Sequence, residues 1–124
     1  MPAHDRHGAA SATALRDVAA LTHGDHLCVV YETLADLLPF VSAFVGEGLR
    51  RGERCVYCVD DHADHDILPT LAGSGIDVDR AIGRGALVCL PADGYRGPGE
   101  FDPASMLEHL DTAVARARAD GFTG

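Results

Sequence analysis

The chain has 124 residues, of which 47% are hydrophobic and 23% are charged, a length that fits one domain with a core of modest size. The formal net charge of -9 argues against nucleic acid and membrane surfaces as direct partners, because both require a basic face. The sequence contains no lysine, which excludes a Walker-A phosphate-binding loop and lysine Schiff-base chemistry.

Residues 1–22 are predicted to form an N-terminal tail with a short helix over residues 14–21. This stretch lacks the apolar core of a secretory signal, and the chain has no apolar run of about 18 residues that could span a membrane. We therefore expect a cytoplasmic protein. Its four cysteines should then be thiols or metal ligands and not structural disulfides: Cys28, Cys55, Cys58 and Cys89.

The remaining residues, 23–124, alternate between strand-like and helix-like segments. Short apolar or β-branched runs predict strands at 26–31, 54–59 and 86–90. Helices are predicted at 34–51, 66–71, 76–82 and 102–120. This alternation predicts an α/β fold of three layers, with a mostly parallel sheet and flanking helices. Because another strand is expected after the last helix, we expect the domain to be incomplete at its C-terminus.

The two longest predicted helices have clear start and stop signals. Thr33 is placed to cap the first of them, and Gly52 to end it. Asp102 is the N-cap of the last helix, with Pro103 in its first turn and Gly121 after its end. The last helix also has apolar residues at helical spacing, which predict a buried face: Met106, Leu107, Leu110, Val114 and Ala117.

Several sequence pieces recur in order with a recognisable spacing. They are residues 24–28 (GDHLC), 31–33 (YET), 51–55 (RGERC), 95–97 (YRG) and 101–103 (FDP). Together they resemble the MEDS domain, a prokaryotic sensory module also described as DcmR-like, over residues 23–124. The resemblance implies a RecA/KaiC-like fold without its P-loop. It also implies that the domain senses small organic molecules such as hydrocarbon derivatives for a DNA-binding, kinase or anti-sigma output.

His26 and Cys28 stand two residues apart in a predicted strand, so their side chains should share a face. If the strands 26–31 and 54–59 are neighbours, Cys55 lies near Cys28. In the resemblance, His26, Cys28 and Cys55 are hallmarks of the family. They could line a small-ligand site or form a soft metal-ligand cluster. The structural alternative is a histidine at a strand start and two cysteines packed as small apolar residues.

Polar and aromatic residues follow each predicted strand, at the carboxyl edge where open α/β sheets bind ligands. Tyr31 and Glu32 follow the first strand, Asp60 follows the second, and Tyr95 lies in the loop after the third. A solvated loop, a helix N-terminus or ordinary core packing would explain each of them equally well. Cys55 and Cys58 have C-x-x-C spacing, but opposite faces of a strand are a poor context for redox or zinc chemistry.

The sequence therefore predicts a non-catalytic sensory domain that binds a small organic ligand and needs no cofactor. The expected lining residues are His26, Cys28, Tyr31, Glu32, Cys55, Asp60 and Tyr95. The main alternative is a metal or thiol-redox sensor that uses His26, Cys28 and Cys55. A third interpretation is an interaction module that pairs with a second copy of the chain as a homodimer. An output domain or partner of DNA-binding, kinase or anti-sigma type completes the expected assembly.

Overall fold

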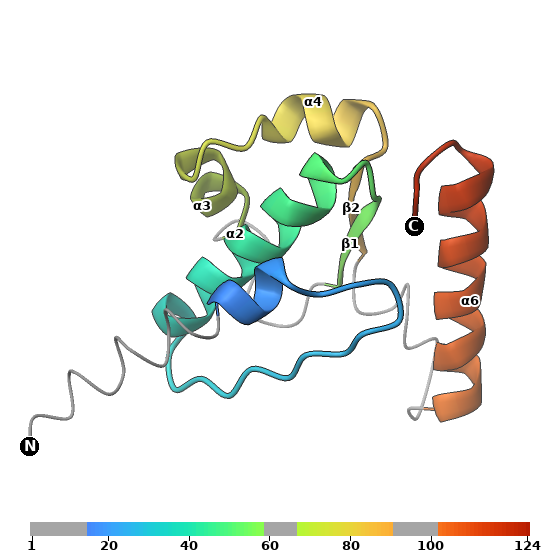
Figure 1. The fold of residues 1–124 in the computed structure, drawn as a ribbon, viewed down its shortest axis with the longest axis horizontal. Helices are drawn as coiled ribbons and strands as arrows, with labels where there is room; N and C mark the ends of the chain where they lie inside the picture. Colours follow the sequence, from blue (N-terminus) through green and yellow to red (C-terminus); the bar gives the residue numbers. More distant parts are fainter. Residues whose placement is uncertain (1–14, 59–66, 91–101) are drawn as a thin grey trace, which may run out of the picture. The chain divides into compact units, whose positions relative to one another are not determined.

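A computed structural model describes residues 15–58, 67–90 and 102–124 of the chain (Figure 1). A first helical turn covers residues 15–19, within the helix predicted there. The further elements are α2 (Leu34–Arg50), β1 (Cys55–Cys58), α3 (Ile67–Gly73), α4 (Val78–Gly83), β2 (Leu87–Leu90) and α6 (Pro103–Ala119). The chain divides into two units, residues 1–47 and 48–124, with the division inside α2.

The sheet of the described residues consists of two parallel strands. β1 and β2 pair in register from Cys55 with Leu87 to Cys58 with Leu90, and the Cys55 N–H donates to the carbonyl of Ala86 at 2.7 Å. Parallel strands need a crossover connection, which here contains α3 and α4. The prediction of a mixed α/β fold with a parallel sheet is confirmed.

Residues 26–31, predicted to be the first strand, form neither strand nor helix. Their exposure still alternates as in an extended chain: Leu27 and Val29 are half-buried, Cys28 is exposed, and Val30 is 99% exposed. The strand prediction is therefore wrong for this structure. The physical reason is that β-branched composition favours an extended backbone, whereas a strand also needs a partner ladder, and the described residues provide none for this segment.

Helix α2 begins and ends at the residues that the sequence indicates. The Thr33 hydroxyl accepts from the N–H of Asp36 at 3.3 Å, and the Asp36 carboxylate accepts from the N–H of Thr33 at 3.2 Å, which is the reciprocal pattern of a capping box. The helix runs through Pro39 and ends before Gly52, which has a left-handed φ of +76°. Both cap predictions are confirmed.

The core of the second unit gathers around the sheet and its crossover helices. Asp77 caps α4 by accepting from the N–H of Arg80 at 3.2 Å, and α4 packs against both α3 and β2. The buried hydrophobic residues of this unit are Cys55, Ile67, Leu71, Val78, Ala81, Ala86, Leu87 and Ala117. The two short helices thereby hold the crossover against the strands.

Helix α6 has the predicted ends but not the predicted burial. Asp102 caps it by accepting from the N–H of Ala104 at 3.2 Å and from the hydroxyl of Ser105 at 2.8 Å. Of its expected apolar face, Ala117 is buried, whereas Leu107, Leu110 and Val114 are exposed by 62%, 48% and 45%. The expectation of a fully buried stripe is wrong here. Helical periodicity identifies an apolar face, but covering that face needs a second surface, and the described residues leave these three side chains open.

Candidate functional site

The residues predicted to line a ligand site begin with a histidine–cysteine pair in the first unit. His26 Nε2 and Cys28 Sγ lie 3.5 Å apart, and both residues are exposed. The alternating geometry that the sequence predicted therefore does place the two side chains on one side of the chain, even though the segment is not a strand. The pair offers an imidazole and a polarisable thiol to solvent within reach of a single small molecule.

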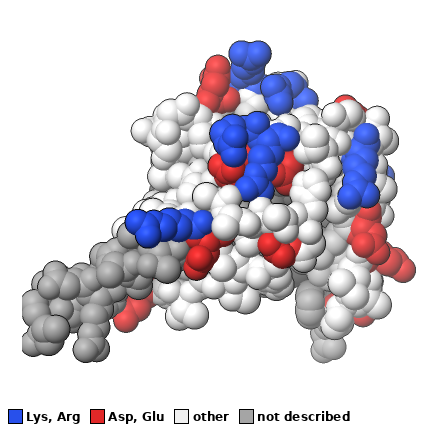
Figure 2. All heavy atoms as spheres, viewed as in Figure 1, with Lys and Arg blue, Asp and Glu red and all other residues white. Residues whose placement is uncertain are grey.

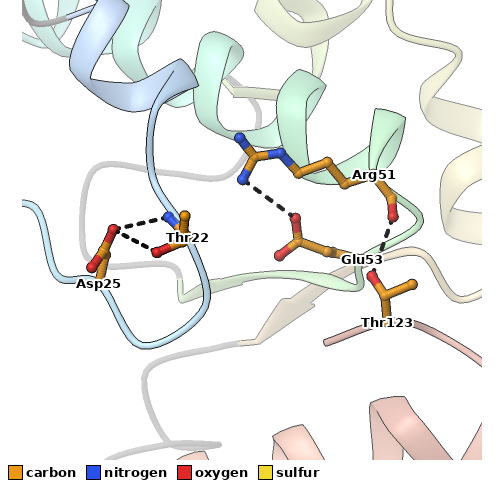
Figure 3. A network of polar contacts seen from close by, with 5 residues as sticks. All are labelled: Thr22, Asp25, Arg51, Glu53 and Thr123. Atoms are coloured by element: carbon orange, nitrogen blue, oxygen red, sulfur yellow. Dashed lines mark hydrogen bonds and ion pairs between the residues drawn. The ribbon is translucent and has the colours of Figure 1, made fainter.

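A tight turn precedes this pair and fixes where the extended segment starts. The Asp25 carboxylate accepts from both the N–H and the hydroxyl of Thr22, at 2.9 and 3.1 Å (Figure 3). The N–H of Asp25 donates back to the carbonyl of Thr22 at 3.0 Å, and Gly24 adopts a φ of +90°. The backbone and hydroxyl hydrogen bonds from Thr22 lower the pKa of Asp25, so this carboxylate is ionised at neutral pH.

Tyr31 and Glu32 lie at the other end of the extended segment, immediately before the cap of α2. Tyr31 is 42% exposed, and Glu32 is also exposed. Their side chains are therefore open to solvent in the same segment as His26 and Cys28. Asp60 and Tyr95, the two remaining predicted lining residues outside the sheet, lie outside the described residues.

Cys55 differs from Cys28 because it is part of the packed core of the second unit. Its residue is 5% exposed, and a Cβ atom built on Gly48 of α2 would stand only 2.7 Å from its Sγ. Burial raises the pKa of the Cys55 thiol to about 11, the negative charge of Glu53 adds to this rise, and a backbone hydrogen bond at Leu49 opposes it. Cys55 is therefore a neutral, close-packed thiol at physiological pH.

The other two sheet cysteines, Cys58 and Cys89, are half-buried. All four cysteines of the chain are free, and burial raises the pKa of Cys58 as well. Because Cys55 and Cys58 lie three residues apart within β1, their side chains leave opposite faces of the sheet. Across residues 15–58, 67–90 and 102–124, no group of three or more His, Cys, Asp or Glu side chains is arranged to hold a metal ion.

The sequence did not predict that the side chain of Arg54, directly before β1, contacts several distant residues. Its Nε donates to the carbonyl of Gly85 at 2.8 Å, and its Nη2 donates to the Asp120 carboxylate at 2.7 Å. The guanidinium also lies 4.6 Å from the centre of the Phe122 ring. Arg54 thus joins the start of β1, the turn before β2 and the end of α6. The motif at residues 51–55 marked this arginine, but its partners lie 31 and 66 residues away, where no local signal could identify them.

The last residues of the chain bind the same part of the second unit. The Thr123 N–H donates to the carbonyl of Gly52 at 3.0 Å, and the Arg54 N–H donates to the carbonyl of Gly124 at 2.9 Å. The Thr123 hydroxyl donates to the carbonyl of Arg51 at 3.2 Å, next to the ion pair of Arg51 with Glu53 at 4.0 Å (Figure 3). Hydrogen bonds therefore hold the segment after α6 against the turn that leads into β1.

The structure and its candidate residues define a small α/β domain with a parallel sheet and an exposed histidine–thiol pair. Of the three sheet cysteines, Cys55 is buried, and Cys58 and Cys89 are half-buried. None of its described helices has the length and apolar character needed to cross a lipid bilayer. Residues 25–124 match the model of one protein family, MEDS, described as the "MEthanogen/methylotroph, DcmR Sensory domain". The chain belongs to this family of sensory domains, and the resemblance noted in the sequence is confirmed. No curated protein and no solved structure matched the chain.

Proposed function

We propose that this chain is the ligand-binding, non-catalytic sensory module of a prokaryotic signalling or transcription-regulating protein. The observation that carries the proposal is its membership of the MEDS sensory family over residues 25–124. The proposed ligand is a small organic molecule such as a simple hydrocarbon derivative. The residues that we propose to contact it are His26, Cys28, Tyr31, Glu32, Asp60 and Tyr95. Cys55 is left out of the predicted set because it is 5% exposed and packed against Gly48.

The ends of the two strands support a site at the carboxyl edge of the sheet. β1 and β2 are parallel and end in register, with Cys58 beside Leu90. The chain therefore leaves the sheet at one common edge on its way to Asp60 and to Tyr95. Ligands of open α/β sheets bind outside this edge, which is why we assign both residues to the site.

The chemistry of the exposed segment supports a ligand with one polar group and a short apolar part. His26 and Cys28 supply adjacent hydrogen-bonding atoms 3.5 Å apart. Val30 and Tyr31 supply apolar surface that is open to solvent. Small-molecule sites commonly combine an apolar lining with a few polar groups that fix orientation, and this segment contains both.

Signalling then requires that the ligand bind two states of the protein with different affinity. A ligand shifts an equilibrium only by its differential binding free energy, and a tenfold preference is worth about 1.4 kcal/mol. The output that reads this shift is a DNA-binding, kinase or anti-sigma domain or partner. Pairing of residues 26–31 as a strand on ligand binding would supply a structural difference between the states, because none of the described strands pairs with this segment.

A metal or thiol-redox sensor is the second candidate function, favoured by the contact between His26 and Cys28. Metal binding and thiol oxidation both need a thiolate, and the high pKa of the buried Cys55 makes that residue a poor source of one. Organic-ligand binding is therefore the better supported proposal. Stoichiometric metal in the purified protein by elemental analysis, or oxidation of Cys28 and Cys55 by mild oxidant, would reverse this order.

The experiment is a thermal-shift screen of the 124-residue chain against small alcohols, halocarbons, aldehydes and organic acids. We expect at least one compound class to raise the melting temperature in a saturable manner. His26→Ala and Cys28→Ala should abolish the shift, whereas His109→Ala, an exposed histidine of α6, should retain it. A panel without any saturable shift, or a shift that survives both substitutions, would refute the proposed site.

A further inference from the structure

The extended segment at residues 26–31 presents three different groups in one row. His26, Cys28 and Val30 are exposed, whereas Leu27 and Val29 between them are half-buried. In an extended chain, side chains two residues apart share a face, so an imidazole, a thiol and an isopropyl group follow one another along the exposed face. The distance of 3.5 Å between His26 Nε2 and Cys28 Sγ agrees with this arrangement.

Cys28 is the cysteine of this chain that is best placed to act as a nucleophile. It is exposed, whereas Cys55 is buried and Cys58 and Cys89 are half-buried. A thiol attacks carbon as its thiolate, and a base within hydrogen-bond reach forms the thiolate by taking the thiol proton. His26 Nε2 is such a base at 3.5 Å. Cys28 therefore combines access for a solute with a partner that can hold its proton.

The described part of the proposed site is open, which limits what non-covalent contacts alone can contribute to binding. Small-molecule sites usually bury most of the surface of their ligand, whereas Val30 is 99% exposed and Tyr31 is 42% exposed. A ligand of a few carbon atoms that lies on such a surface keeps much of its own area in water. A reversible covalent bond compensates for this, because its strength does not depend on enclosure of the ligand.

A sensor must also release its ligand, which restricts the electrophiles that it can bind through a thiol. Displacement of halide from a halocarbon leaves a thioether that does not revert, and alcohols and carboxylate ions offer no carbon that a thiol attacks at neutral pH. An aldehyde, in contrast, adds a thiol reversibly. The chain contains no lysine, so every cationic side chain in Figure 2 is an arginine. No side-chain amine therefore competes for an aldehyde by forming a Schiff base.

We propose, building on the proposed function, that the ligand is a linear aliphatic aldehyde that Cys28 binds as a hemithioacetal. Cys28 Sγ bonds to the carbonyl carbon as the π bond of C=O breaks, and the thiol proton passes through His26 Nε2 to the new alkoxide oxygen. No group leaves, no oxidant or reductant is needed, and the reverse step restores the thiol and the aldehyde. The alkyl chain lies on Val30, two residues and about 6.6 Å farther along the extended segment, a distance that a chain of about four or five carbons spans.

The test is an NMR titration of the 124-residue chain with pentanal that is isotopically labelled at its carbonyl carbon, because the hemithioacetal carbon gives a signal distinct from those of the aldehyde and its hydrate. We expect saturable binding with a dissociation constant at least about tenfold below that of N-acetylcysteine with the same aldehyde, because His26 adds a hydrogen bond and Val30 an apolar contact. Cys28→Ser should abolish the hemithioacetal signal, whereas Cys89→Ser, which alters a half-buried thiol of β2, should retain it.

Two further variants test the roles of the neighbouring side chains. His26→Ala should weaken the binding of pentanal at least about tenfold, because the thiol loses its base and the hemithioacetal hydroxyl loses its hydrogen-bond partner. His109→Ala is the matched control and should leave the affinity unchanged. Val30→Ser should weaken the binding of pentanal but not that of acetaldehyde, whose single methyl group is too short to reach Val30.

The outcomes separate this inference from the proposed function on which it rests. Pentanal that raises the melting temperature without a hemithioacetal signal, or that Cys28 binds no more tightly than N-acetylcysteine does, would overturn the covalent step and leave the proposed function intact. The absence of a saturable thermal shift with every compound class would refute both. A pentanal affinity that Val30→Ser leaves unchanged would overturn the placement of the alkyl chain.

Discussion

The close approach between α2 and β1 gives a sharp test of how Cys55 is packed. Gly48 lies inside α2, and a Cβ atom at this position would stand 2.7 Å from the Cys55 Sγ, far inside the contact distance of carbon and sulfur. Replacing a helix-interior glycine by alanine normally stabilises a helix by about 1 kcal/mol. Overpacking a well-filled core costs about 1–3 kcal/mol. We therefore expect Gly48→Ala to destabilise the protein by about 1 kcal/mol, because the steric cost exceeds the gain in helix propensity.

The sign of this effect should reverse when the sulfur is removed. In a Cys55→Ala background, Gly48→Ala meets no Sγ atom and should stabilise the protein by about 0.5–1 kcal/mol. The difference between the two backgrounds is the interaction free energy of a double-mutant cycle. Urea unfolding followed by far-ultraviolet circular dichroism measures all four proteins. A Gly48→Ala substitution that stabilises both backgrounds equally would show that Cys55 is not packed against α2, and the interpretation of its high pKa would fail with it.

Two further predictions concern the second unit. Because the pKa of Cys55 is about 11 in the folded chain and 9.0 as a model thiol, its contribution to stability is complete below pH 9 and declines as the pH rises to 11. Over this interval the unfolding free energy of the wild type should fall by up to about 3 kcal/mol more than that of Cys55→Ala, and parallel curves would contradict the assignment. Arg54→Ala should lower the unfolding free energy by about 2–3 kcal/mol, because it removes a charged hydrogen bond to Gly85. Asp120→Asn, which alters only the exposed partner, should cost less than about 1 kcal/mol, and equal losses would argue against a central role of Arg54.

Local signals in the sequence predicted the ends of the elements well. Thr33, Gly52, Asp102 and Gly121 each act within one helical turn, and hydrogen bonds or positive φ angles confirm all four. Capping depends on side-chain chemistry and backbone freedom at adjacent positions. Such interactions are complete within a few residues, so the sequence alone is sufficient to predict them.

Interactions between distant segments account for what the sequence did not predict. Residues 26–31 have the composition of a strand, but a strand is defined by a ladder, and composition does not identify the partner. Leu107, Leu110 and Val114 show helical periodicity, which does not say whether the apolar face meets the chain's own core or another molecule. The partners of Arg54 lie far along the chain, because the crossover connection brings Gly85 to the start of β1 and the end of α6 brings Asp120 there.

The same distinction between local and long-range interactions applies to the candidate site. The contact between His26 and Cys28 follows from the two-residue period of an extended chain, and it was predictable without knowing the fold. The burial of Cys55 depends on Gly48 and on the pairing of β1 with β2, which are interactions of the folded second unit. Exposed Cys28 and buried Cys55 are therefore chemically different thiols, although the sequence suggested one common role for them.

The central claim, that a small organic molecule binds beside His26 and Cys28, is tested most directly by the alkylation rate of Cys28. Iodoacetamide modification followed by mass spectrometry distinguishes this exposed thiol from the buried Cys55 within a single sample. A compound that raises the melting temperature should slow the modification of Cys28 in a saturable manner, over the concentrations that produce the thermal shift. A Cys28 alkylation rate that every stabilising compound leaves unchanged would contradict the account.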